Sequence, residues 1–347
     1  MKRIQSLDVL RGLALCGIIF ANIAPILGLQ FPDDGSIPPV YTAVELFVTG
    51  RFFPIFSFLF GISFALMWRG ARSRSASPRI VLLRRVLLLG VVGALHQLLQ
   101  PGEALLPYAI AALVFLLPAT FLPKKWALPV LVPLGGAAVV FAAVSGGGLA
   151  LVPGLFLLGY AAGLADMPGT LERSRTIVPA GLAIGLPVSV LGTWMQHQNT
   201  AIAGGSTLAA AVAAFAGLVV AATLSLLVVW AVQRSILPGV QRAIAALGRT
   251  SLTNYVGATL IITALKLLSG PLGFAPTQPR VWPLAMVAAT LILVVQAGVS
   301  LWWLRTWRQG PLEAALRAFS WWEIVPLRRS RGADAAEATP STLAPAP

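Results

Sequence analysis

Ten long apolar runs constrain this chain more than any other feature of its sequence. Each is about long enough to cross roughly 30 Å of hydrocarbon as a helix. With 57% hydrophobic and 10% charged residues and a mean hydropathy of +0.85, the chain is more apolar than a soluble domain of this length requires. We therefore expect an all-α polytopic membrane protein with about ten transmembrane helices, at 9–29, 50–68, 80–99, 107–122, 126–145, 149–165, 177–195, 207–232, 251–269 and 281–304.

Two of these runs, 107–122 and 149–165, are short. They are expected either to cross with little tilt or to be partly re-entrant. The opening Met-Lys-Arg and the apolar run after it are typical of a signal peptide, but Asp8 and Arg11 interrupt the run. No small-residue cleavage site follows, so we expect the segment to be retained.

The distribution of basic residues predicts the topology. If the N-terminus is cytoplasmic, only Arg51, Lys266 and Arg280 of the 25 Lys and Arg residues lie outside or near the outer face. This asymmetry favours an even number of spans with both termini cytoplasmic. The net charge of +14 then reflects topology, so the expected partner is a lipid bilayer and not nucleic acid. The sequence does not indicate an oligomeric state.

Three regions follow from this pattern. Residues 1–310 are expected to form the transmembrane helical domain. Residues 311–325 form a cytoplasmic interfacial amphipathic helix, because Leu312, Leu316 and Phe319 recur at helical spacing. The tail 326–347, rich in Ala, Pro, Thr and Ser, is expected to be disordered.

Polar residues inside the first run form the first candidate site. Asp8 and Arg11 are one helical turn apart and face the same way, so they are able to pair. Asn22 lies on the same face, roughly 16 Å deeper than Arg11. Charged groups at membrane depth usually face protein or a water-filled cavity. The alternative is that Asp8 and Arg11 only anchor the helix at the lipid headgroups.

The third run carries the candidate catalytic pair. His96 lies near its outer end, and Glu103 follows across the Pro101-Gly102 break. A neutral imidazole oriented by a carboxylate is a general base for a hydroxyl or an amine. The alternative is a single interhelical hydrogen bond. Arg85, at the inner end of the run, lies on nearly the same face as His96 and joins the candidate donor-binding residues.

A third candidate site opens the ninth run. Thr250 and Ser251 are positioned to cap a helix start, and with Arg249 they form an anion site on the cytoplasmic face. Asn254 continues that polar face inward. The phosphates of a donor such as coenzyme A would suit this place, although helix capping alone also explains the hydroxyls.

Glu45, Arg51 and Lys266 lie toward the outer face and are candidate substrate-binding residues. Arg51 and Lys266 have an alternative as side chains that snorkel to the headgroups. The chain has no metal-ligand spacing, phosphate-cradling glycine loop or nucleophile elbow. We therefore expect no metal. The single cysteine, Cys16, excludes an intramolecular disulfide.

With these residues in hand, the chain resembles the YeiB-like family of bacterial inner-membrane proteins, a domain-of-unknown-function family (four-one-eight) in the transmembrane acyltransferase superfamily. The resemblance covers nearly the whole chain. It rests on Leu7-Asp8-Val9-Leu10-Arg11-Gly12 with Asn22, on Arg51-Phe52-Phe53-Pro54-Ile55-Phe56-Ser57-Phe58-Leu59-Phe60-Gly61, on Leu95-His96 with Gly102-Glu103 and Tyr108, on Gly248-Arg249-Thr250-Ser251-Leu252-Thr253-Asn254-Tyr255, and on Arg308-Gln309-Gly310-Pro311-Leu312-Glu313. Where the family typically has Gly-Asp-Ile-Leu, this chain has Gly102-Glu103-Ala104-Leu105.

The resemblance implies a multi-pass protein of the bacterial inner membrane. By analogy with the superfamily, it implies transfer of an acyl group from a cytoplasmic acyl-CoA, such as acetyl-CoA, to an envelope glycan or lipid at the outer face. Asp8, Arg11, Asn22, Arg85, Arg249, Thr250 and Asn254 would bind the donor, and His96, oriented by Glu103, would deprotonate the acceptor. The alternative function is a transporter or exporter of a small molecule or lipid, although no matching pair of interrupted helices points to one.

Overall fold

Seven helices are long and apolar enough to cross a membrane in the computed structural model, which describes residues 4–203, 206–323 and 327–328. A bent helix pair raises the number to as many as eight. The seven candidates are Gln5–Leu27, Pro39–Arg74, Lys124–Val144, Ile177–Asn199, Thr207–Gln233, Ser251–Ser269 and Val281–Thr306. Seven of the ten predicted runs are thus confirmed as helices of membrane-spanning length and composition.

The described part of the chain is helical and contains no strand beyond an isolated bridge between Trp307 and Arg328. Its helices are α1 (Gln5–Leu27), α2 (Pro39–Phe47), α3 (Phe52–Arg74), α4 (Pro78–His96), α5 (Leu105–Ala111), the π-helical turn η1 (Ala112–Leu116), α6 (Leu117–Ala119), α7 (Lys124–Val144), the 3-10 turn η2 (Gly148–Leu151), α8 (Val152–Leu164), α9 (Met167–Arg173), α10 (Ile177–Ala203), α11 (Thr207–Gln233), α12 (Pro238–Arg249), α13 (Ser251–Ser269), α14 (Val281–Thr306) and α15 (Pro311–Trp321).

The other three predicted runs are helical but fall outside the criteria for a complete span. α4 has 19 residues and carries Arg79, Arg84 and Arg85. The run 107–122 lies in the shorter apolar helix Leu105–Ala119. The run 149–165 belongs to the bent pair, Gly148–Leu164 and Met167–Arg173, whose axes differ by 65°. The run in α4 therefore differs from the seven spans by its arginines, and the other two runs differ by their shorter helices.

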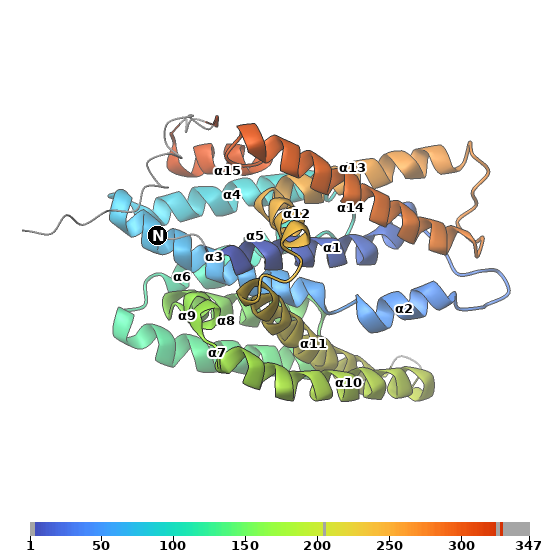
Figure 1. Cartoon of the computed structure of the whole chain (residues 1–347), viewed down its shortest axis with the longest axis horizontal. Helices are drawn as coiled ribbons and strands as arrows, with labels where there is room; N and C mark the ends of the chain where they lie inside the picture. Colours follow the sequence, from blue (N-terminus) through green and yellow to red (C-terminus); the bar gives the residue numbers. More distant parts are fainter. Residues whose placement is uncertain (1–3, 204–205, 324–326, 329–347) are drawn as a thin grey trace, which may run out of the picture.

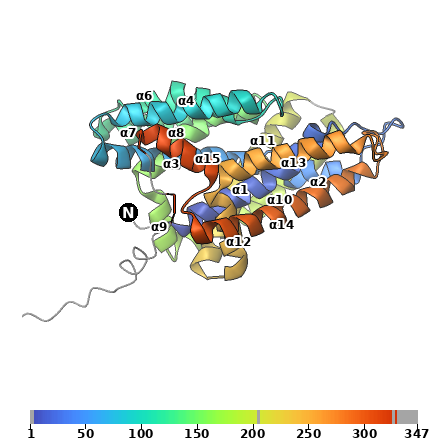
Figure 2. The same ribbon diagram turned by 90° about the horizontal axis from the view of Figure 1, so that it is seen from above.

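Most of the long helices run side by side, and α1 lies among them (Figure 1). α1 contacts α3, α11, α12, α13 and α14. Figure 2 shows α4 and α6 on one side of the molecule and α12 and α14 on the other, with α1 between them. The start of α1 and the helix α15 lie at the same end of the bundle (Figure 1). The polar face of α1 is therefore surrounded by protein.

Glycines allow two pairs of helices to approach closely. A Cβ at Gly61 of α3 would overlap the backbone of Phe156 and Tyr160 in α8. A Cβ at Gly248 of α12 would overlap the carbonyl of Asp8 in α1. Small residues at such crossings let helix backbones pack directly on one another, as is usual in membrane helix bundles.

Part of the predicted segment 311–325 is helical as α15, which ends at Trp321; its position at the cytoplasmic interface stays a prediction. α15 packs against α4 and α13. Cation–π contacts hold its end, with Arg74 over Trp321 at 4.5 Å and Arg84 over Trp322 at 5.0 Å. Residues 324 and 325 of the predicted helix, and all of the predicted disordered tail 326–347 apart from 327–328, lie outside the described residues.

Candidate functional site

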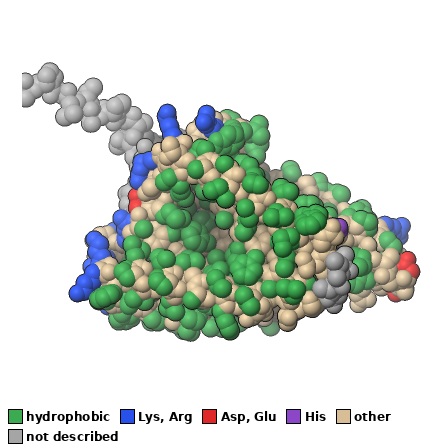
Figure 3. Space-filling model, turned by 90° about the horizontal axis from the view of Figure 1, so that it is seen from below, with side chains coloured by type: hydrophobic (Ala, Val, Ile, Leu, Met, Phe, Trp, Pro, Cys, Tyr) green, Lys and Arg blue, Asp and Glu red, His purple; other side chains and the backbone are tan. Residues whose placement is uncertain are grey.

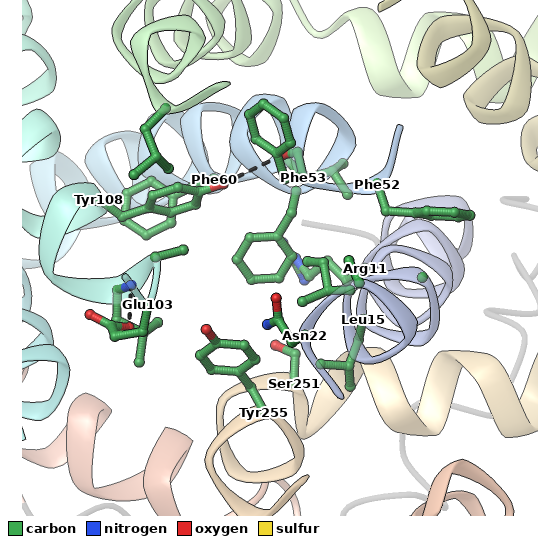
Figure 4. A pocket seen from close by; sticks show the side chains of 18 of the residues that line it. Arg11, Leu15, Asn22, Phe52, Phe53, Phe60, Glu103, Tyr108, Ser251 and Tyr255 are labelled. Atoms are coloured by element: carbon green, nitrogen blue, oxygen red, sulfur yellow. Dashed lines mark hydrogen bonds between the residues drawn. The ribbon is translucent and has the colours of Figure 1, made fainter. Parts of the chain in front are cut away.

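One cavity of about 810 Å³ collects most of the predicted site residues. It lies between α1, α3, the α4–α5 connection, α11, α13 and α15. In Figure 4, labelled side chains of α1, α3, the α4–α5 connection, α5 and α13 surround a common space. Asp8, Arg11, Asn22, Glu45, Arg51, Arg85, Glu103 and Arg249 line it, whereas His96, Thr250, Asn254 and Lys266 do not.

Arg11, Arg85, Arg249 and Arg308 line one part of the cavity, which we call the basic end. The predicted pairing on α1 is present, since Arg11 Nη1 lies 3.3 Å from Asp8 Oδ1. Arg11 Nη2 also donates to Ser63 Oγ at 2.7 Å, so the guanidinium is fixed against α3.

Arg85 is a cation of the basic end whose charged neighbours oppose one another. Its charged neighbours are Arg11, which repels it, and Glu313, which attracts it. Its guanidinium makes no hydrogen bond to any residue in the described part of the chain. Glu313 is itself engaged by the start of α13, where it accepts from the Leu252 N–H at 2.7 Å and from Thr253 Oγ1 at 2.6 Å. The basic end therefore keeps a positive balance suited to an anionic ligand.

Glu103 is fixed by three donors. It accepts from the backbone N–H groups of Leu105 and Leu106 at 2.6 and 2.7 Å, and its Oε2 lies 3.3 Å from His96 Nδ1. The carboxylate thus satisfies the free N–H groups at the start of α5, as an N-terminal capping residue does. Glu103 is among the residues that line the cavity, and its side chain is itself buried, so a carboxylate with a fixed orientation stands in the cavity wall.

His96 lies behind Glu103 and does not line the cavity. The side chain is buried, and its ring packs edge-on against Tyr255 with 5.0 Å between centroids. Nε2 has no hydrogen-bond partner among the described residues. The predicted pairing with Glu103 is present, and of the two residues only Glu103 is among those that line the cavity, although both side chains are buried.

The cavity has a polar wall and an aromatic wall (Figure 4). On the polar wall, the Tyr255 hydroxyl interacts with Glu103, Asn22 and Gln100. On the opposite wall, Tyr108 donates to or accepts from Ser57 Oγ at 2.5 Å. The aromatic wall consists mainly of Phe52, Phe53, Phe56, Phe60, Phe64 and Tyr108. A ligand would therefore meet hydrogen-bonding groups on one side and rings on the other.

Arg51 defines the second polar part of the cavity, which we call the Arg51 end. Its guanidinium is 1% exposed and donates to the carbonyls of Glu45 at 3.2 Å and Thr49 at 2.5 Å, and to Gln196 Oε1. Arg51 therefore does not snorkel to a surface. Its Nε is buried without a partner among the described residues. The Glu45 carboxylate accepts from Thr49 Oγ1 at 3.0 Å.

Three predicted residues lie elsewhere. Thr250 and Asn254 are buried where α12, α13 and α14 meet, and Asn254 Nδ2 donates to Thr250 Oγ1 at 2.8 Å and to Ser300 Oγ at 3.0 Å. This network joins helices and does not face the cavity. Lys266 is exposed, near Gly28 at the end of α1.

The sequence reasoning did not select several residues that line the cavity: Ser63, Gln100, Tyr108, Gln196, Tyr255, Arg308 and Glu313. Four of them belong to the motifs that carry the family resemblance, and that membership could have identified them: Tyr108, Tyr255, Arg308 and Glu313. No sequence signal identifies Ser63, Gln100 or Gln196, because their roles depend on contacts between helices that are distant in the sequence.

Together, the fold and the cavity define an all-helical, membrane-type protein with a charged and aromatic ligand space between its helices. A model of the family described as "Protein of unknown function (DUF418)" matches residues 158–323. The chain is 31% identical, over 361 residues, to an uncharacterized 39.9 kDa protein in the amylase 3' region of Bacillus acidopullulyticus, covering 96% of this chain and 98% of that relative. The chain belongs to the DUF418 family.

A second relative is the uncharacterized protein YxaH of Bacillus subtilis (strain 168). It is 25% identical over 404 residues, covering 94% of this chain and 96% of that protein. No solved structure matches the chain significantly. The family resemblance deduced from the motifs is thus confirmed, and the relatives are bacterial proteins without an assigned function.

Proposed function

We propose that this protein is a membrane-embedded acyltransferase that moves an acyl group from a cytoplasmic acyl-CoA to an acceptor at the outer face of the bacterial inner membrane. One observation carries the proposal: the basic end and Glu103 line the same cavity. Arg11 and Asn22, on one face of α1, are roughly 16 Å apart in depth. Such a span suits an extended donor with phosphates at one end and a reactive group at the other.

Donor binding would take place at the basic end. Phosphate oxygens pair strongly with guanidinium groups, and Arg85 has no hydrogen-bond partner in the described part of the chain. Arg11 and Arg249 also line the cavity, and Arg249 donates to the Arg308 carbonyl at 3.0 Å. Acetyl-CoA is the simplest donor of this class.

The His96–Glu103 pair would accept the proton of the acceptor through the Glu103 carboxylate. The acceptor oxygen or nitrogen then bonds to the thioester carbonyl carbon, and the carbon–sulfur bond breaks. Coenzyme A leaves as the thiolate, and the proton held by the pair passes to its sulfur. His96 acts through Glu103 and is a positioning residue. The roles therefore differ from the sequence-based hypothesis, in which His96 itself faced the acceptor.

Transfer of radioactive acetyl groups tests this proposal. Inside-out vesicles containing the full chain are supplied with labelled acetyl-CoA, and label in the lipid and glycan fractions is counted. Glu103→Gln should lower the rate by about 10²–10⁴-fold, the usual contribution of a general base, and His96→Ala should also lower it. His197→Ala, at an exposed histidine outside the cavity, is the matched control. Undiminished transfer by Glu103→Gln would reject the assignment.

The alternative function is a transporter, and one observation favours it. Charged side chains line both the basic end and the Arg51 end of a single cavity, as they would along a transport path. Sealed vesicles distinguish the two functions. Uptake or efflux of a solute without any covalent acetyl product would favour transport, and a labelled acceptor would favour transfer.

A further inference from the structure

One part of the cavity, which we call the side branch, is lined by no charged residue. It lies between the turn linking α7 to α8 and the first turns of α11. Its lining residues are all apolar and mostly small: Gly146, Gly148, Leu149, Leu151, Ala210, Ala213 and Ala214. No residue of this side branch carries a charge or a hydrogen-bonding side chain, so it is suited to hydrocarbon.

The side branch reaches the surface of the molecule. Leu149 lines the cavity and is also 47% exposed, and Gly148 is exposed beside it. The molecule is hollowed on the face drawn in Figure 3, where hydrophobic side chains ring the hollow. An opening with an apolar rim among membrane-type helices faces lipid tails more favourably than water.

The backbone geometry of the α7–α8 turn favours glycine at this opening. Gly146, Gly147 and Gly148 have positive φ values of 103°, 76° and 63°, which glycine adopts without strain. A Cβ at Gly147 would lie 2.7 Å from Ala214 Cβ. The turn thus packs directly on the alanines of α11, and a side chain larger than that of glycine would not fit at Gly147.

The Arg51 end supplies a polar group for the same ligand. Gly217 of α11 packs against the carbonyl of Gly50, the neighbour of Arg51. Arg51 lines the cavity, is 1% exposed, and has an Nε donor without a partner among the described residues. A buried donor of this kind is normally satisfied by an acceptor atom. An oxygen of a ligand headgroup is such an acceptor.

We propose that the acceptor substrate is a membrane lipid, whose oxygen-bearing headgroup binds at Arg51 and whose hydrocarbon tail passes through the side branch into the bilayer. This inference rests on the proposed function and narrows it, because a lipid and not a soluble glycan then receives the acyl group. The lipid enters laterally between the α7–α8 turn and α11, while the donor occupies the basic end.

Photolabelling tests the side branch directly. The full chain is placed in nanodiscs containing phosphatidylglycerol with a diazirine in its tail, illuminated, and analysed by peptide mass spectrometry. Labels are expected in 146–151 and 207–218 above the level on the exposed surface of α10. Ala213→Phe should reduce this labelling at least about tenfold, since a ring that fills the branch leaves no room for a tail.

Ala222→Phe is the matched control, because Ala222 is exposed on the same helix and does not line the cavity. It should leave the labelling unchanged. Size-exclusion chromatography checks folding, and Ala210→Phe replaces Ala213→Phe if that variant aggregates. Equal labelling in the folded blocking variant, or wild-type labelling no higher than on α10, overturns the inference.

The outcomes separate this inference from the proposed function. If the side branch is labelled but no acetyl transfer occurs, the lipid site stands and the transferase proposal fails. If the side branch is unlabelled and a water-soluble glycan is acetylated equally by wild type and Ala213→Phe, transfer stands and the lipid inference fails.

Discussion

At the scale of single residues, the same side-chain type serves different purposes according to what surrounds it. Arg51 and Arg85 both line the cavity, but Arg51 is enclosed by carbonyl groups, whereas Arg85 has no hydrogen-bond partner in the described chain. Asn22 lines the cavity, but Asn254 links three helices. Helical spacing singled out Asn22, Arg85 and Asn254, and Arg51 was selected for its position toward the outer face. Neither criterion could separate ligand-facing groups from structural ones, because that depends on neighbouring helices.

Arg85 gives the first prediction at this scale. Arg85→Gln removes a cation from the basic end and should weaken acetyl-CoA binding by about tenfold or more, since a hydrogen bond to a charged group contributes about 1.5–3 kcal/mol. Binding is measured with labelled acetyl-CoA on the purified protein. Lys266→Gln, which removes an exposed charge away from the cavity, should bind normally. Equal affinity in wild type and Arg85→Gln would remove Arg85 from the donor site.

Asn254 gives the second prediction at the scale of single residues. Asn254→Leu leaves the hydroxyls of Thr250 and Ser300 without its amide donor, which should lower the free energy of unfolding by about 1–3 kcal/mol. Thermal unfolding in detergent measures the loss. The variant that remains folded should still bind acetyl-CoA, because this side chain does not line the cavity. Loss of binding with unchanged stability would contradict the structural role.

At the scale of helices, close crossings and the C-terminal helix determine the shape of the cavity. α3 supplies the aromatic wall and packs on α8 through Gly61. α15 supplies Glu313 and Leu316 to the cavity. The amphipathic spacing predicted that α15 would be a helix, but a lipid surface and a protein groove require the same spacing. Its packing against α4 and α13 was therefore not deducible from the pattern.

Gly61→Leu should disrupt the α3–α8 crossing. Its side chain would overlap the α8 backbone, and overpacking of this kind typically costs about 1–3 kcal/mol. Lower thermal stability and lower yield of monodisperse protein are expected. Gly136→Leu is the control, since a Cβ at this helical glycine meets nothing within 4 Å. Similar stability losses in both variants would show that the crossing is not as close as described.

At the scale of the whole molecule, the membrane character, the helical fold and the family could be predicted from the sequence, because long apolar runs and local motifs are sufficient for each. The number of membrane-spanning helices could not be predicted from apolar runs and local motifs. α4 carries three arginines, and 105–119 and 148–164 are short, so whether they span depends on the neighbours that shield them. The cavity itself arises from segments far apart in the chain.

Topology tests the arrangement of the whole molecule. If all ten predicted runs cross, both termini are cytoplasmic, as the distribution of Lys and Arg favours. Fusions to green fluorescent protein at the C-terminus should then fluoresce, whereas alkaline phosphatase fused there should be inactive. Phosphatase fused after Gln100, between α4 and α5, should be active. The opposite pattern at either position would contradict the ten-span topology.

We propose that one cavity holds both ends of the donor, with its phosphates at the basic end and its acyl group at Glu103. Cryo-electron microscopy of the full chain in nanodiscs with a non-hydrolysable acetyl-CoA analogue measures this most directly. We expect density with phosphates beside Arg85 and Arg249 and the acetyl end beside Glu103. A map at saturating analogue in which the cavity is collapsed, or in which the analogue binds elsewhere, would contradict this proposal.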